Sequence, residues 1–286
     1  MLVAERITDP VTHHGEGPFW DVHRGRLLCV DALEGAVVAI DDNGKSARHQ
    51  LPTRVLTVVR RRSSGGYVLA TDHAVAVVND DFLDFEVIAQ FTDDPTLRAN
   101  DGGCDPFGNF VVGTMAYDEG IGRGTVYLVT PNREIFELFS PVSISNGVQW
   151  SSDGRRAFYV DSPTRRVDVF DIDPRTSLWV NRRQHICVEA TGFPDGMAID
   201  EEDGLWIALW GSGAVHHYDA SGRLVEQVQL VGVTQVSSCA FGGPGNDVLY
   251  ITTSRLGLAD DCEQDAGAVF AVQAGTRGAA QAEFAG

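Results

Sequence analysis

The amino-acid sequence predicts an all-β protein, a six-bladed β-propeller of four-stranded blades in which residues 1–286 form a single domain. One pattern recurs six times at intervals of about 40 to 50 residues: a turn containing glycine, a short apolar strand, and then a second strand. This interval is the length of a four-stranded propeller blade. No stretch of a dozen residues carries apolar side chains at helical spacing. A β-sandwich of many short strands is the alternative, but sixfold recurrence favours the propeller.

The strands are placed by their turns and their β-branched or aromatic residues. The turn and first strand of each repeat fall at residues 25–30, 66–70, 108–112, 154–160, 204–208 and 246–251. The strand that follows it in each repeat is expected at 36–40, 74–78, 125–129, 166–170, 214–218 and 268–272. Further strands are expected at 85–90, 134–139 and 224–230, and residues 2–7 form a candidate strand that closes the ring.

Composition narrows the function classes. Forty-three per cent of the 286 residues are hydrophobic and 22% are charged, as in an ordinary globular protein. The formal net charge of −18 argues against a nucleic-acid partner, which needs clustered Lys and Arg. No apolar run reaches the roughly 18 residues of a membrane span, and the first residues lack a signal-peptide pattern. We therefore expect a cytoplasmic protein with no membrane partner, monomeric or weakly homo-oligomeric, that acts on a small molecule.

The cysteines do not indicate a disulfide framework or a thiolate zinc site. There are five, an odd number, and none forms a C-x-x-C pair. We interpret them as small buried apolar side chains. They are Cys29, Cys104, Cys187, Cys239 and Cys262.

Four oxygen-bearing side chains occupy the same phase of the repeat. Each stands eight or nine residues before a turn glycine, in the segment that forms the innermost strand of a propeller blade. They are Glu16, Asn100, Asn146 and Asp195, and the matching positions of the other two repeats fall near Thr57 and Ser237. Equivalent positions of a radial repeat lie on a ring around the axis. We therefore expect the four donors to converge at one mouth of the central channel.

Each donor also has a structural interpretation, because Asn-Gly and Asp-Gly pairs are common turn formers. The coincidence of four of them in one phase favours a site. Two carboxylates and two amides are the ligands that Ca²⁺, Mg²⁺ and Mn²⁺ prefer. The sequence therefore predicts one divalent cation. Calcium is the preferred candidate, magnesium and manganese come next, and zinc and ferrous iron remain open alternatives.

The motifs around these donors resemble those of the gluconolactonase, regucalcin (senescence marker protein) and luciferin-regenerating enzyme family. The likeness runs from about Glu16 to the C-terminus, with the segments in the same order and at approximately the same spacing. The matching segments are Gly15-Glu16-Gly17-Pro18-Phe19-Trp20-Asp21, Arg98-Ala99-Asn100-Asp101-Gly102 with Asp105-Pro106-Phe107-Gly108, Gly113-Thr114-Met115, Ile144-Ser145-Asn146-Gly147 with Trp150, Pro194-Asp195-Gly196-Met197 with Asp200 and Gly204-Leu205-Trp206, and Ser237-Ser238-Cys239-Ala240-Phe241-Gly242-Gly243.

The resemblance implies a six-bladed propeller that hydrolyses sugar-acid lactones with a divalent metal. It implies that the metal ligands are Glu16, Asn146 and Asp195, and that Asp195 is also the catalytic proton acceptor. It implies substrate binding by three further residues: Arg98, Asn100 and Asp118. Relatives carry a glutamate at the last of these positions, so Glu119 is an alternative to Asp118. Whether Asp195 or a metal-bound hydroxide is the true base is left open.

The predicted function is a metal-dependent lactonase that opens a sugar lactone to the aldonate. One alternative is another ester or organophosphate hydrolase of the propeller type, and another is a calcium-binding regulatory propeller without catalysis. Arg98 and Asn100 favour catalysis, since a purely structural ion does not need them. Among other residues, His13-His14 is interpreted as a turn flank or channel-rim group, and Arg60 as part of a solvated basic loop. Trp210 is either a wall of the sugar site or a packing residue.

Overall fold

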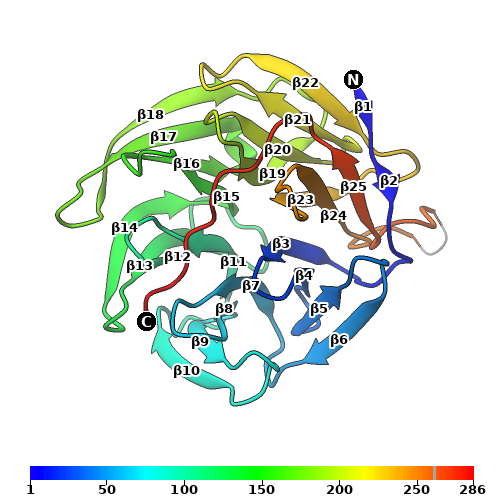
Figure 1. Cartoon of the computed structure of the whole chain (residues 1–286). Coiled ribbons are helices and arrows are strands. Elements are labelled where there is room, and N and C mark those ends of the chain that lie inside the picture. Colours follow the sequence, from blue (N-terminus) through cyan, green and yellow to red (C-terminus); the bar gives the residue numbers. More distant parts are fainter. Residues whose placement is uncertain (260–261) are drawn as a thin grey trace.

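The computed structural model describes residues 1–259 and 262–286. Its strands form six sheets arranged around a central axis (Figure 1), which confirms the predicted six-bladed β-propeller. In the described ranges the one helical element is the 3₁₀ turn η1 (Ser162–Thr164). In the same ranges no helix is long and apolar enough to cross a membrane.

Each blade contains four antiparallel strands arranged outward from the axis, and the fifth blade carries one additional parallel strand at its outer edge. The innermost strands are β3 (Gly15–Asp21), β7 (Leu56–Arg61), β11 (Leu97–Cys104), β15 (Ser145–Trp150), β19 (Phe193–Ile199) and β23 (Val236–Gly242). The second strands are β4 (Arg26–Asp31), β8 (Tyr67–Thr71), β12 (Phe110–Ala116), β16 (Arg156–Asp161), β20 (Leu205–Trp210) and β24 (Val248–Thr253). The third strands are β5 (Ala36–Ile40), β9 (Ala74–Val78), β13 (Gly124–Val129), β17 (Arg166–Ile172), β21 (Ala214–Tyr218) and β25 (Val269–Gln273).

The outer strands are more polar. They are β6 (Ser46–Gln50), β10 (Glu86–Gln90), β14 (Ile135–Val142), β18 (Trp179–Cys187), β22 (Leu224–Gln229) and β2 (Glu5–Arg6). The sequence patterns missed β6 and β18, because most of their residues are exposed and carry no apolar alternation. The expected strands at 36–40, 74–78 and 214–218 are confirmed with their bounds.

The ring closes through the N-terminal segment, but the expected strand at 2–7 divides between two blades. β1 (Leu2–Val3) pairs in parallel with β22, and β2 pairs with β25 in the antiparallel sense. Between them Ala4 is buried, and its backbone N–H donates to the Gln229 carbonyl at 3.0 Å. The segment therefore joins the fifth blade to the sixth (Figure 1).

Blades pack through apolar faces of the inner strands, and Trp206 of the fifth blade lies edge-on to Phe241 of the sixth at 5.7 Å. Trp206 of β20 is fully buried, and its indole N–H donates to the Asp200 carboxylate at 3.0 Å. The His217 ring stacks on Trp206 at 4.1 Å and pairs with the same carboxylate at 3.0 Å. Trp206 is thus a packing residue, as its place in the repeat indicates.

After β25 the chain crosses one face of the propeller (Figure 1, red). The Gly278 and Ala279 backbone N–H groups donate to carbonyls of blades six and five. Phe284 is fully buried, lies edge-on to Phe110 at 6.3 Å, and makes backbone hydrogen bonds with Arg61 at the end of β7 and with Ser63 in the turn to β8. This tail therefore ties several blades together across the face opposite the candidate site described below.

Candidate functional site

The innermost strand of every blade pairs irregularly with the second strand near the predicted donor position. The register shifts lie between Glu16 and Phe19, Leu56 and Val58, Ala99 and Asp101, Asn146 and Val148, Pro194 and Met197, and Val236 and Ser238. A bulge of this kind bends a strand and redirects a side chain. The shared phase in the sequence is therefore a shared backbone irregularity in the structure.

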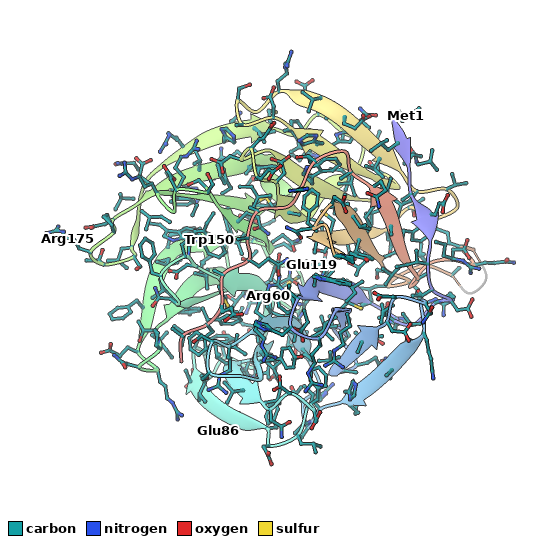
Figure 2. The ribbon with its side chains drawn as sticks, viewed as in Figure 1. Met1, Arg60, Glu86, Glu119, Trp150 and Arg175 are labelled. Atoms are coloured by element: carbon teal, nitrogen blue, oxygen red, sulfur yellow. The ribbon has the colours of Figure 1, made fainter. Side chains whose placement is uncertain are left out.

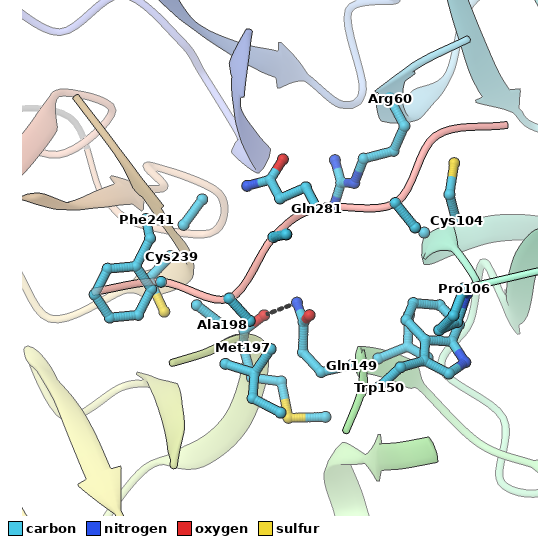
Figure 3. Close-up of a pocket in the computed structure, with 18 of the residues that line it drawn as sticks. Arg60, Cys104, Pro106, Gln149, Trp150, Met197, Ala198, Cys239, Phe241 and Gln281 are labelled. Carbon is cyan, nitrogen blue, oxygen red and sulfur yellow. Dashed lines mark hydrogen bonds between the residues drawn. The ribbon is translucent and has the colours of Figure 1, made fainter. Parts of the chain in front are cut away.

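The channel has a cavity at each end, and the two share no lining residue. A cavity of about 370 Å³ lies where the inner strands begin, and five predicted site residues line it: Glu16, Arg98, Asn100, Asn146 and Asp195. A larger cavity of about 520 Å³ lies where those strands end, partly roofed by residues 278–282 of the tail (Figure 3). We place the candidate site in the smaller cavity, because the donors converge there.

Asn146 is oriented by hydrogen bonds from both sides. Its Nδ2 donates to Ser162 Oγ at 2.8 Å, and Ser162 Oγ donates to the Pro194 carbonyl at 2.7 Å. Its Oδ1 accepts one bond from Asn100 Nδ2 at 3.1 Å. A carbonyl oxygen has two lone pairs, so Asn146 Oδ1 can accept a second partner from the cavity. The amide is therefore held with its oxygen available as a ligand.

Close packing also sets the distance between the strands that carry Asn146 and Asp195. A Cβ at Gly147 would lie 2.7 Å from the Asp195 carbonyl oxygen and 2.9 Å from Met197 Cγ. The backbones can approach this closely only because Gly147 has no side chain.

Arg98 is buried in the cavity wall, with 7% of its surface exposed. Its Nη1 donates to the Ala99 carbonyl at 2.9 Å and to Asn100 Oδ1 at 2.7 Å. Both of these bonds use Nη1, so within the described part of the chain Nε and Nη2 remain donors for a ligand. The arginine thus fixes Asn100 and presents a planar fork of the kind that binds carboxylate oxygens.

Two buried carboxylates, those of Glu16 and Asp195, line the cavity. Burial raises the pKa of Glu16 to about 8, and the nearby Asp101 carboxylate adds to the effect. Burial raises the pKa of Asp195 well above its usual value, with Glu16 and then Asp101 contributing. Arg98 opposes both shifts only in part. These carboxylates lack sufficient positive charge around them, and a divalent cation would provide it.

The donor set therefore fits a hard cation: two carboxylates from different blades and an amide oxygen held in place. No group of three His, Cys, Asp or Glu side chains in metal-binding geometry occurs among residues 1–259 and 262–286. The candidate ligand set contains only two such side chains, Glu16 and Asp195, because its third member is the amide of Asn146. Glu16, Asn146 and Asp195 are the residues that could hold the cation.

The stability of the metal-free protein should depend on pH through Glu16. The folded-state pKa of about 8 exceeds the ordinary value of 4.5, so the native state binds more protons than the unfolded state between these values. The free energy of unfolding should therefore fall as pH rises through this window, and stabilisation by added Ca²⁺ should grow. Thermal unfolding of chelated protein from about pH 5 to 8 measures both effects.

Glu16→Gln is the control for this prediction, because it keeps the side-chain size and removes the titrating group. Its metal-free melting temperature should change less across the window than that of the wild type. A wild-type melting temperature that falls no more steeply than that of Glu16→Gln would contradict the prediction.

The predicted substrate residues are not all brought together. Asp118 does not line the cavity: its side chain is 71% exposed and pairs with Arg123 at 3.3 Å. Glu119 lines the cavity mouth and has a left-handed backbone, with φ of 56°. Figure 2 shows Glu119 near the centre of the propeller. The turn therefore carries the first acid outward and leaves the second at the mouth.

The structure separates the two adjacent histidines. His13 is exposed, whereas His14 is buried and lines the cavity. Burial, together with the charge of Arg98, lowers the pKa of His14 to about 3, so its ring is neutral. Trp210 lines the cavity too, as one of the two interpretations of the sequence had it. The burial of His14 was missed, because its partners are far away in the sequence.

Arg60 corrects one interpretation of the sequence. It does not belong to a solvated loop but to β7, and its guanidinium lines the larger cavity (Figure 3). Its Nη1 donates to the carbonyls of Gly17 at 3.1 Å and Val59 at 2.8 Å. Arg60 therefore ties the first two blades together in the channel.

The fold and the site define a propeller with an oxygen-rich, cation-compatible pocket at one channel mouth. The sequence model described as the SMP-30/Gluconolactonase/LRE-like region matches residues 14–255. Regucalcin from Xenopus laevis is 32% identical over 284 residues, which cover 95% of each chain. Regucalcin from Homo sapiens is also 32% identical over 284 residues, with the same coverage. The chain belongs to the SMP-30/gluconolactonase/LRE-like family, which confirms the resemblance seen in the motifs.

Solved structures agree with this assignment. A luciferin-regenerating enzyme superposes with a TM-score of 0.91 at 30% identity and covers 99% of both chains. A regucalcin from Agrobacterium tumefaciens, described as a calcium-binding protein, superposes with a TM-score of 0.91 at 27% identity, covering 100% of this chain and 98% of the other. The similarity therefore extends over the whole propeller and includes all the strands that carry the candidate site.

Proposed function

We propose that this protein is a hydrolase that opens sugar-acid lactones to aldonates with the help of one divalent cation. Calcium is the preferred candidate, and magnesium, manganese, zinc and ferrous iron are the alternatives. The observation that carries the proposal is the convergence of Glu16, Asn146 and Asp195 with the buried Arg98 in one cavity. An ion with a purely structural role has no need of an arginine fork beside it. The family name and the description of the Agrobacterium tumefaciens regucalcin support the activity and the choice of calcium.

The chain's own residues divide the chemistry between them. Glu16, Asn146 and Asp195 would hold the cation, which would supply Lewis acidity toward the lactone carbonyl and the charge that develops on its oxygen. Arg98 binds substrate oxygens and favours the carboxylate of the product through its planar fork. Asn100, held by Arg98 and Asn146, orients the substrate.

Asp195 accepts a proton from the attacking water as the bond between water oxygen and carbonyl carbon forms. The bond between the carbonyl carbon and the ring oxygen then breaks, and the same proton passes to the leaving alkoxide. The net change is the addition of one water to the lactone, with no redox step. The position of Asp195 between Pro194 and Gly196, within a bulge, holds its carboxylate in a fixed direction, as proton transfer requires.

We assign the acidic substrate contact to Glu119 in place of Asp118. Glu119 lines the cavity mouth, where its carboxylate can accept hydrogen bonds from the hydroxyl groups of a sugar lactone. Asp118 is engaged by Arg123 outside the cavity.

The proposal is tested with a lactone panel assayed by acid release after chelation and after return of single divalent cations. Gluconate, xylonate, arabinonate and galactonate lactones form the panel, with aryl esters and organophosphates as comparison substrates. We expect turnover of at least one sugar lactone that disappears on chelation and returns with Ca²⁺. Turnover of aryl esters or organophosphates alone would indicate another hydrolase of the propeller type. Tight cation binding without turnover of any compound would indicate a regulatory propeller.

A further inference from the structure

We infer that His14 is a specificity-determining residue whose Nε2–H donates a hydrogen bond to an oxygen of the substrate. The inference rests on the proposed function for the class of substrate, a polyhydroxylated lactone. It concerns a side chain that lies on the cavity wall beside Glu16 and Arg98.

His14 is held rigidly where three blades meet. Its backbone N–H donates to Asp31 Oδ1 at 2.9 Å, and its backbone forms an antiparallel bridge with Ser254. The Trp210 ring packs edge-on against the imidazole, with centroids 5.8 Å apart and planes at 89°. Only 6% of the residue is exposed. A ring fixed in this way loses little conformational entropy when it contacts a ligand.

The hydrogen bonds around Ser254 select the tautomer of the ring. Ser254 Oγ accepts from the Leu256 backbone N–H at 3.0 Å, and it lies 2.8 Å from His14 Nδ1. The serine hydroxyl has one hydrogen, and among residues 1–259 and 262–286 the acceptor within its reach is His14 Nδ1. His14 Nδ1 therefore accepts, and the neutral imidazole carries its proton on Nε2.

The Nε2 atom is left for the cavity. In the described part of the chain it has no protein hydrogen-bond partner. It is not fully buried, so a ligand in the cavity can reach it. A protonated Nε2 cannot coordinate a cation but can donate to a sugar hydroxyl or to the ring oxygen of a lactone. A buried donor left unpaired by a substrate that lacks this oxygen disfavours that substrate. His14 thus selects among lactones and leaves cation binding to other residues.

The test pairs an enzyme variant with altered substrates. His14→Phe keeps a planar apolar ring against Trp210 and removes the donor, and His13→Phe, at the exposed neighbour, is the matched control. For the wild type, one monodeoxy lactone should lose about 3- to 10-fold in kcat/KM relative to its parent, the effect of one neutral hydrogen bond. In His14→Phe the parent should lose the same factor, mostly through KM, and the deoxy compound should lose little. His13→Phe should keep wild-type discrimination.

Two further measurements separate this role from others. Calcium affinity measured by calorimetry should be unchanged in His14→Phe, and Ser254→Ala should weaken discrimination in the same direction. Nitrogen NMR of the histidine rings, assigned by comparison with His14→Phe, should report the Nε2-protonated tautomer.

The inference is overturned by unchanged discrimination in folded His14→Phe, by loss of calcium affinity in that variant, or by an Nδ1-protonated ring. If the wild type turns over no lactone at all, the proposed function fails, and this inference about substrate selection fails with it. If the wild type is active and His14→Phe discriminates normally, only the inference about His14 fails.

Discussion

Replacement of Asp195 by asparagine should lower kcat for lactone hydrolysis by about 10² to 10⁴-fold at saturating cation, the range that a general base contributes. Asparagine keeps the size and one ligand oxygen but cannot accept the proton of the attacking water. Asp195→Ala should abolish activity and also weaken cation binding, because it removes one of three ligands. Steady-state kinetics together with calorimetric titration of Ca²⁺ distinguish the two variants.

Asp118→Asn is the matched control, since that carboxylate is exposed and lies outside the cavity. It should keep activity within about twofold of the wild type, as expected of an exposed position. Normal turnover by Asp195→Asn with cation bound would contradict the role of Asp195 as base and leave only its role as ligand.

Phe284→Ala should destabilise the protein by about 3–5 kcal/mol, the cost of truncating a buried phenylalanine. Phe284 is fully buried in the cluster that joins the second and third blades. Its backbone bonds to Arg61 and Ser63 of the second blade, and the next residue, Ala285, donates to the Gly108 carbonyl of the third. Denaturant unfolding measures the change. Phe136→Ala, at an outer strand where the ring is 44% exposed, should cost less than about 1 kcal/mol. Equal costs for the two variants would show that the tail does not anchor the blades.

The inner part of each blade could be predicted from the sequence, because its strands are buried and appear in the sequence as apolar runs that follow turn glycines. β6 and β18 could not be predicted in the same way, since their side chains face solvent. The division of the N-terminal segment at Ala4 and the course of the tail depend on tertiary contacts, such as those of Phe284, that no local pattern encodes.

The site divides in a similar way. The four donors could be found because equivalent positions in a radial repeat lie on one ring around the axis. They are Glu16, Asn100, Asn146 and Asp195. Glu119 could not be separated from Asp118, because the choice depends on one left-handed residue in an exposed turn. The position of His14 depends on Ser254, which is distant in sequence and adjacent in space.

The most direct test of the cation site is anomalous diffraction from crystals of the chelated protein soaked in Mn²⁺. We predict one strong peak in the smaller cavity, within coordination distance of Glu16, Asn146 and Asp195, and its loss in Asp195→Ala. A protein that binds Mn²⁺ in solution but shows no peak at these three residues, or a peak only elsewhere, would contradict the account.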